Sequence, residues 1–156
     1  MPPVTPLASM IDHTLLKAEA TRAQSEKLWA EAKQFNFASV GVNPCRVAMS
    51  AEILKGSNVK VCTVIGFPLG ANRAEVKALE TVRACADGDG EIDMVINQGA
   101  WHEGRAALVE DDIFSVVAAA RRSGAMVKVI FETSALRDGH ALTREQQIEL
   151  LCAMAQ

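Results

Sequence analysis

Five short apolar runs alternate with longer amphipathic stretches along this chain, and this alternation limits the fold more than any other feature of the sequence. We expect strands at residues 11–14, 38–43, 59–66, 91–97 and 126–133. Helices are expected from Thr21, from Pro44 to about residue 55, over about 72–86 and 104–122, and from Thr143, where a capping box reaches Gln146. Strands that alternate with helices predict repeated βα units, an α/β fold and a parallel sheet.

The fourth run carries a carboxylate in its middle. Ile92, Met94 and Val95 surround Asp93 and make the run look buried on both faces, as in a parallel sheet covered on both sides. Burial of an ionised Asp costs several kcal/mol unless the group is paired or hydrogen-bonded. Asp93 is therefore a candidate catalytic group, and a purely structural ion pair with Lys128 of the next run is the alternative interpretation.

The expected crossovers predict where a site would form. Right-handed βα connections place the carboxyl ends of all strands on one rim, which is where α/β active sites are built. The polar or turn-forming residues expected at or near that rim are Asp12, Asn43, Gly66, Asn97 and residues 132–133. In the helix expected over residues 72–86, Val76, Leu79 and Val82 share one face, which we expect to pack in the core.

Charge and composition exclude several classes of function. With 156 residues, a net charge of -3 and a pI near 5.6, the chain lacks the excess of positive charge that is typical of proteins that bind nucleic acid or an anionic membrane. No apolar run reaches the roughly 18 residues of a spanning helix, and residues 1–6 do not resemble a signal peptide. We therefore expect a cytoplasmic protein. Its four cysteines are expected to be reduced and without a metal or redox role, with Cys62, Cys85 and Cys152 in apolar surroundings.

Five phrases of the sequence together resemble one known family. They are residues 11–17 (IDHTLLK), 39–44 (SVGVNP), 61–70 (VCTVIGFPLG), 91–97 (EIDMVIN) and 127–133 (VKVIFET). In this order they closely resemble the deoxyribose-phosphate aldolases, which are class I aldolases built on a TIM barrel. The resemblance extends from residue 11 to residue 156.

The resemblance implies a lyase that cleaves 2-deoxy-D-ribose 5-phosphate reversibly to D-glyceraldehyde 3-phosphate and acetaldehyde. It implies no metal and no cofactor, because a lysine of lowered pKa forms a Schiff base with this small sugar phosphate. Asp93 matches the family's aspartate that relays protons through water, and Lys128 matches a lysine beside the nucleophile with an electrostatic role. Asp12 and Thr14 match residues near the sugar.

The resemblance also indicates what this sequence lacks. It implies that the Schiff-base lysine lies on a sixth strand and that the phosphate site lies on the seventh and eighth. TIM barrels typically span about 250 residues. We therefore expect residues 1–156 to form a single truncated TIM-barrel domain with about five of the eight strands, and we expect no complete aldolase reaction from this chain alone. The alternative is a non-catalytic remnant or binding fragment, and exposed sheet edges favour self-association in either case.

Two positions depart from the family pattern. Gly41 replaces a frequent cysteine, which removes an inward thiol and no catalytic group. Asp89 replaces part of a usual Gly-Ala pair before the fourth strand, where a turn is expected to tolerate it at a small cost in packing.

Overall fold

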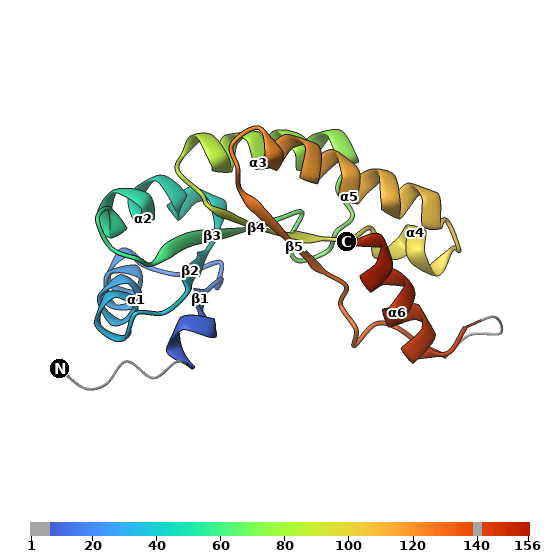
Figure 1. The fold of residues 1–156 in the computed structure, drawn as a ribbon, viewed down its shortest axis with the longest axis horizontal. Helices are drawn as coiled ribbons and strands as arrows, with labels where there is room; N and C mark the ends of the chain where they lie inside the picture. The colour runs from blue at the N-terminus through green and yellow to red at the C-terminus, as the bar shows by residue number, and fades with distance from the viewer. Residues whose placement is uncertain (1–6, 139–141) are drawn as a thin grey trace.

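The computed structural model describes residues 7–138 and 142–156 and contains one parallel sheet (Figure 1). The residues in which no signal peptide was expected, 1–6, lie outside this range. The strands are β1 (Asp12–Leu15), β2 (Ser39–Val42), β3 (Lys60–Ile65), β4 (Glu91–Val95) and β5 (Met126–Ile130). Their order in the sheet follows the sequence, and every neighbouring pair is parallel. The predicted α/β class and the five parallel strands are confirmed.

Helices connect the strands in the expected places. They are α1 (Arg22–Phe35), α2 (Val47–Leu54), α3 (Ala74–Ala86), α4 (Gln98–His102), α5 (Ala106–Arg121) and α6 (Arg144–Met154), with 3-10 turns η1 (Ala8–Met10) and η2 (Pro44–Arg46). Thr21 and Thr143 each cap a helix through a complete capping box, which for Thr143 confirms the prediction. The short helix α4 was not predicted, although Asn97 caps it through its side chain. No helix within the described residues has the length and apolar character needed to cross a membrane.

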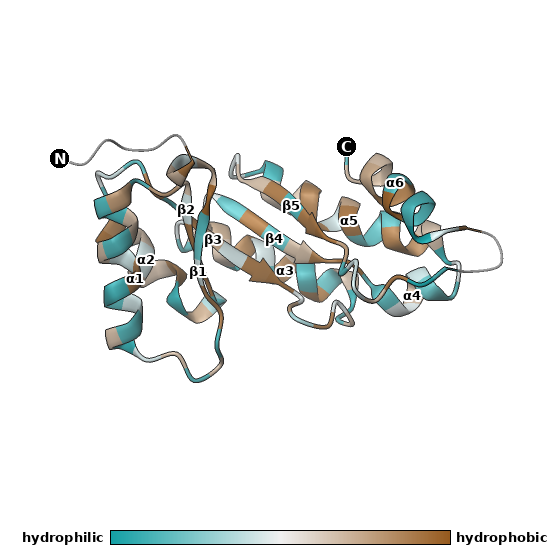
Figure 2. Ribbon diagram, turned by 90° about the horizontal axis from the view of Figure 1, so that it is seen from below, coloured by the Kyte–Doolittle hydropathy of each residue, from teal (hydrophilic) through white to brown (hydrophobic). Residues whose placement is uncertain are grey.

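The strands alternate their side chains between two different surroundings. One face of the sheet packs against helices and forms two apolar clusters, one built around Trp29 and Val40 and the other around Ile92, Met94 and Val109. In Figure 1, α3 and α5 arch over this face. Figure 2, turned by 90° and seen from below, looks toward the second face of the sheet. The side chains of Glu91, Asp93 and Lys128, which alternate with the core residues, lie on that second face.

The sheet is strongly curved. Strands β1 and β5 are the two edges of the sheet and do not pair with each other. Nevertheless, Lys128 Nζ on β5 lies 2.8 Å from Asp12 Oδ2 on β1. Only a sheet that curls toward its second face can bring these strands so close, as in the wall of a barrel.

The prediction for Asp12 was wrong in one respect. Asp12 is the first residue of β1 and thus lies at the amino end of that strand, not at the carboxyl rim. It nonetheless reaches Lys128, which is in the middle of β5. The stagger between neighbouring strands of a barrel places the start of one strand level with the middle of a distant one, and a sequence pattern does not reveal that stagger.

The apolar face expected for α3 does not pack in the core. Val76, Leu79 and Val82 are all exposed, Leu79 to 57%. The buried residues of α3 are instead Lys77, Thr81 and Ala84. Lys77 Nζ binds Asp112 Oδ2 on α5 at 2.6 Å and the Val95 carbonyl oxygen at 2.8 Å. Because these partners satisfy the buried ammonium, the helix can turn its polar face inward.

Two further sequence predictions need correction. Asp89 lies in the expected connection between α3 and β4, but its side chain is buried, with 7% of its surface exposed, so its cost is not only one of packing. Cys152 was expected in apolar surroundings but is exposed on α6, whereas Cys62 is buried and Cys85 is half-buried. All four cysteines are free thiols.

Candidate functional site

The expected ion pair between Asp93 and Lys128 is present, and it belongs to a larger cluster. Lys128 Nζ lies 2.9 Å from Asp93 Oδ2, 2.8 Å from Asp12 Oδ2 and 3.5 Å from Glu91 Oε1. Strand β4 supplies Glu91 and Asp93 two residues apart, so both side chains leave the same face. The parallel register places Lys128 directly opposite Asp93. One ammonium group therefore forms ion pairs with three carboxylates, on the face of the sheet that the helices do not cover.

The cluster keeps Lys128 charged. Burial lowers the pKa of Lys128, but hydrogen bonds to Asp12 and Asp93 outweigh this effect and raise the pKa above its ordinary value. Burial likewise opposes the ionised form of Asp12, yet the bonds from Lys128 and Ser39 leave the pKa of Asp12 lowered. A lysine in these surroundings is an ammonium ion at physiological pH and a poor nucleophile.

Lys128 holds Asp93 through one of its two oxygens. Its Oδ2 binds Lys128, while Oδ1 is buried and has no hydrogen-bond partner among the described residues. A carboxylate that an ammonium group holds in a fixed orientation is suited to general acid–base work.

Sequence reasoning missed two members of this cluster, Glu91 and Cys62. Glu91 precedes the recognised Asp93 by two residues, and that spacing alone places both on one face of β4. Cys62 pairs with Glu91 across β3 and β4. Burial raises the pKa of the Cys62 thiol, and the nearby Asp93 charge raises it further. Cys62 is therefore a neutral, unreactive thiol.

The donor set also resembles a metal site. One ligand atom each from Cys62, Glu91 and Asp93 lies within 4.8 Å of the others. The Lys128 ammonium, however, already binds Asp93 and contacts Glu91, and it supplies the positive charge that a metal ion would bring. The arrangement therefore fits an ion-pair cluster better than a metal centre.

Thr14 follows Asp12 by two residues on β1 and makes no hydrogen bond with Lys128 or Asp93 within the described part of the chain. Its hydroxyl donates a hydrogen bond to the Asp12 carbonyl oxygen at 2.8 Å. Opposite it, a Cβ atom at Gly41 would lie 2.7 Å from Thr14 Oγ1. The absence of a side chain at Gly41 is thus what gives Thr14 room on this face.

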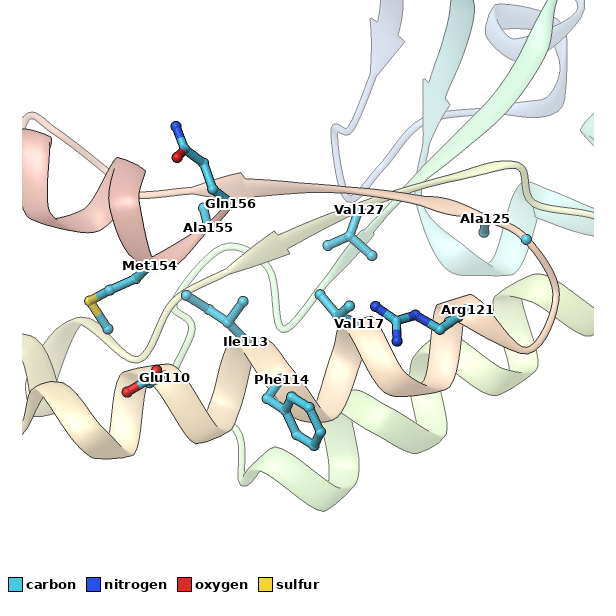
Figure 3. A pocket seen from close by; sticks show the side chains of 11 residues that line it. Glu110, Ile113, Phe114, Val117, Arg121, Ala125, Val127, Met154, Ala155 and Gln156 are labelled. Atoms are coloured by element: carbon cyan, nitrogen blue, oxygen red, sulfur yellow. The ribbon is translucent and has the colours of Figure 1, made fainter.

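A separate cavity of about 450 Å³ lies between α5, β5 and the end of α6 (Figure 3). Figure 3 shows Val127, Ile113 and Val117 pointing into it, with Met154 at its edge. Val127 and Lys128 are neighbours on a strand, so their side chains leave opposite faces. The cavity is therefore on the helix side of β5 and does not adjoin the Lys128 cluster.

Comparison with known proteins gives a consistent result, although no family model matches the chain. The chain is 63% identical to a deoxyribose-phosphate aldolase of Lysinibacillus sphaericus over 131 residues, which are 84% of this chain and 58% of that protein. It is 53% identical to a deoxyribose-phosphate aldolase of Clostridium perfringens over 149 residues, or 96% of this chain and 63% of that protein. The chain thus spans less than two thirds of the length of these curated relatives.

Solved structures agree with the sequences. The chain superposes on a putative deoxyribose-phosphate aldolase from Coccidioides immitis with a TM-score of 0.88 and 38% identity, covering 99% of this chain and 57% of that one. A deoxyribose-phosphate aldolase from Aeropyrum pernix, described as having a unique tetrameric structure, superposes with a TM-score of 0.77 at 34% identity. The match covers 85% of this chain and 55% of that one. The five strands therefore correspond to part of the barrel of these aldolases.

Proposed function

From the premise that this chain belongs to the deoxyribose-phosphate aldolase family, we propose that it supplies the proton-relay part of an aldolase site. The reaction is the reversible cleavage of 2-deoxy-D-ribose 5-phosphate to D-glyceraldehyde 3-phosphate and acetaldehyde through a lysine Schiff base. The contact that supports this proposal most directly is the ion pair between Asp93 and Lys128 at 2.9 Å. It joins the two residues that the family resemblance singles out for proton transfer and for electrostatic support.

Lys128 has an electrostatic role in this proposal and does not form the Schiff base. A Schiff-base lysine needs a neutral amine, and therefore a lowered pKa. The carboxylates around Lys128 have the opposite effect and raise its pKa. The nucleophile is accordingly a different lysine, which the resemblance implies on a sixth strand. The positive charge of Lys128 orients Asp93 for its task.

Asp93 moves protons between a water molecule and the carbon that loses or gains a proton during cleavage. Its carboxylate is the acceptor for this step, and the ion pair with Lys128 holds it in place. Asp12 holds Lys128 from the other side of the barrel, and Thr14 lies beside it on the same face. We assign Asp12 and Thr14 to the sugar end of the substrate, since they share the concave face with Asp93.

Borohydride trapping tests the assignment of the nucleophile. The purified chain is incubated with acetaldehyde or 2-deoxyribose 5-phosphate and reduced with borohydride, and modified peptides are mapped by mass spectrometry. We expect no adduct on Lys128, whereas a lysine on a further strand should be labelled in a longer protein that joins residues 1–156 to the remaining strands of a relative. An adduct on Lys128 would refute its electrostatic role.

The same longer protein tests the catalytic roles. Asp93→Asn should lower kcat at least about 100-fold, because it removes the general base. Lys128→Met should lower kcat by a similar factor through loss of electrostatic support. Asp111→Asn and Lys55→Met change exposed residues of the same types and should leave kcat unchanged. Unchanged turnover in Asp93→Asn would contradict the relay.

The proposal extends to partners and location. The substrate is a small sugar phosphate, and no nucleic acid or membrane takes part. Self-association through the open edges of β1 and β5 is supported by the unpaired backbone that an edge strand presents. A cytoplasmic location is supported by four free thiols, which suit a reducing compartment.

A further inference from the structure

Glu91 is the acid of the Lys128 cluster that lies farthest from the ammonium group. Its side chain is 8% exposed, so water contributes little to its solvation. Asp12 and Asp93 bind Lys128 Nζ at 2.8 and 2.9 Å, within hydrogen-bond range, whereas Glu91 lies at 3.5 Å. Of the three acids, Glu91 therefore has the longest and weakest contact with the ammonium group, although a hydrogen bond from Lys128 still opposes the rise of its pKa.

The surroundings of Glu91 add more negative charge than positive. The ionisable groups near it are Asp12 on β1, Lys60 and Cys62 on β3, Asp89 and Asp93 on β4 or just before it, and Lys128 on β5. If Glu91 were ionised, three carboxylates would share the single Lys128 ammonium, and Glu91 is the least exposed of them. Like charges at this range disfavour the ionised form of the group that is bound most weakly.

We propose that Glu91 takes up a proton before Asp12 as the pH falls, and that it is a positioning residue whose neutral form leaves Lys128 bound to Asp12 and Asp93. A neutral Glu91 lowers the net charge of the cluster without removing either short ion pair. Burial, followed by the charge of Asp12, raises the pKa of Glu91, while the pKa of Asp12 is lowered. This ordering agrees with the distances. The inference deepens the proposed aldolase site, but it concerns the charge of the cluster and can be tested without any turnover.

Carbon-13 NMR of the chain labelled at glutamate side-chain carboxyls measures the proton uptake directly. The Glu91 signal is assigned by its absence in Glu91→Gln, and Glu52, exposed on α2, serves as an internal control. We expect the Glu91 midpoint to lie above that of Glu52. A Glu91 midpoint at or below that of Glu52 would overturn the proposal.

Two variants test the cause of the shift. Lys128→Met removes the cation and should raise the Glu91 midpoint further, whereas Asp93→Asn removes a like charge and should lower it toward the Glu52 value. If neither variant moves the midpoint, Lys128 and Asp93 do not set the charge of Glu91 and the proposal is wrong.

The positioning role has its own readout. Glu91→Gln mimics the protonated side chain, so the Lys128 ammonium should keep its nitrogen-15 chemical shift and its proton-exchange rate in this variant. Asp93→Asn should speed that exchange. Loss of the Lys128 ammonium signal in Glu91→Gln, with its persistence in Asp93→Asn, would show that Glu91 is the main partner of Lys128 and would overturn the inference.

Discussion

Asp89 is expected to destabilise the folded chain at neutral pH, and its removal should therefore be stabilising. Burial, followed by the charges of Asp93 and Glu91, raises the pKa of Asp89 from 3.8 to about 7, although the backbone N–H groups of Gly90 and Glu91 oppose the shift. A folded-state pKa above the unfolded value means that ionisation favours the unfolded chain. The penalty of Asp89 is thus complete above pH 7 and is relieved as the pH falls through the folded-state value. Asp89→Asn keeps the shape of the side chain and removes the charge.

The size of the effect follows from the shift. Each pKa unit corresponds to about 1.4 kcal/mol, so a rise from 3.8 to about 7 gives an upper limit of about 4 kcal/mol at pH 8. At pH 5 most of the folded molecules already carry the proton, and the same two pKa values give a gain of about 2 kcal/mol. Since a domain is stable by only about 5–15 kcal/mol, a change of this size is easily measured.

Urea denaturation of the purified chain at pH 5 and pH 8 provides the assay. Asp87→Asn is the matched control, because Asp87 is exposed in the same turn, and its stability change should be small at both pH values. The difference between Asp89→Asn and the unmodified chain should grow from pH 5 to pH 8. An equal difference at both pH values, or a less stable Asp89→Asn chain at pH 8, would refute the role of buried charge.

Two further substitutions probe other close contacts. Gly70→Ala should destabilise the chain by more than about 2 kcal/mol in urea denaturation, because φ is +67° and the new Cβ would lie 1.8 Å from the Ile96 carbonyl oxygen. Gly56→Ala is the control. Its φ is similar at +78°, but no atom lies within 4 Å of the new Cβ, so the variant should lose only about 1 kcal/mol. Lys77→Met should lower the free energy of unfolding by roughly 3–5 kcal/mol, because it leaves Asp112 buried without its partner. The double variant Lys77→Met with Asp112→Leu should recover most of that loss, as measured by thermal unfolding.

Much of the fold could be predicted because its signals are local. Apolar runs of strand length indicated every strand, and the Thr143 capping box indicated the start of α6 from four residues. The apolar face of α3 misled the prediction because periodicity does not show which side of a helix faces the core. That choice depends on Lys77 finding Asp112, which is 35 residues away in the sequence.

The candidate site was predictable only in part for a similar reason. Asp93 and Lys128 were found because an acid and a lysine interrupt apolar strands that are neighbours in the sheet. The contact between Asp12 and Lys128 joins residues 116 positions apart, from strands that do not pair. It depends on the curvature of the whole sheet. Glu91 was overlooked because an acid at the first position of a strand is usual at a solvent-exposed end, whereas here the end is buried.

Strand β4 is held by lysines on both of its sides, and this arrangement fixes its register. On the concave face Lys128 binds Asp93, and on the helix side Lys77 binds the carbonyl oxygen of Val95, two residues further along. A slip of one residue would move Asp93 into the apolar core and bring Met94 to the charged face. The slip would also remove one contact from each ammonium group, because Lys128 would lose Asp93 and Lys77 would lose the Val95 carbonyl oxygen. The two charged contacts therefore specify the position of Asp93 more strictly than the apolar packing of β4 could specify it alone.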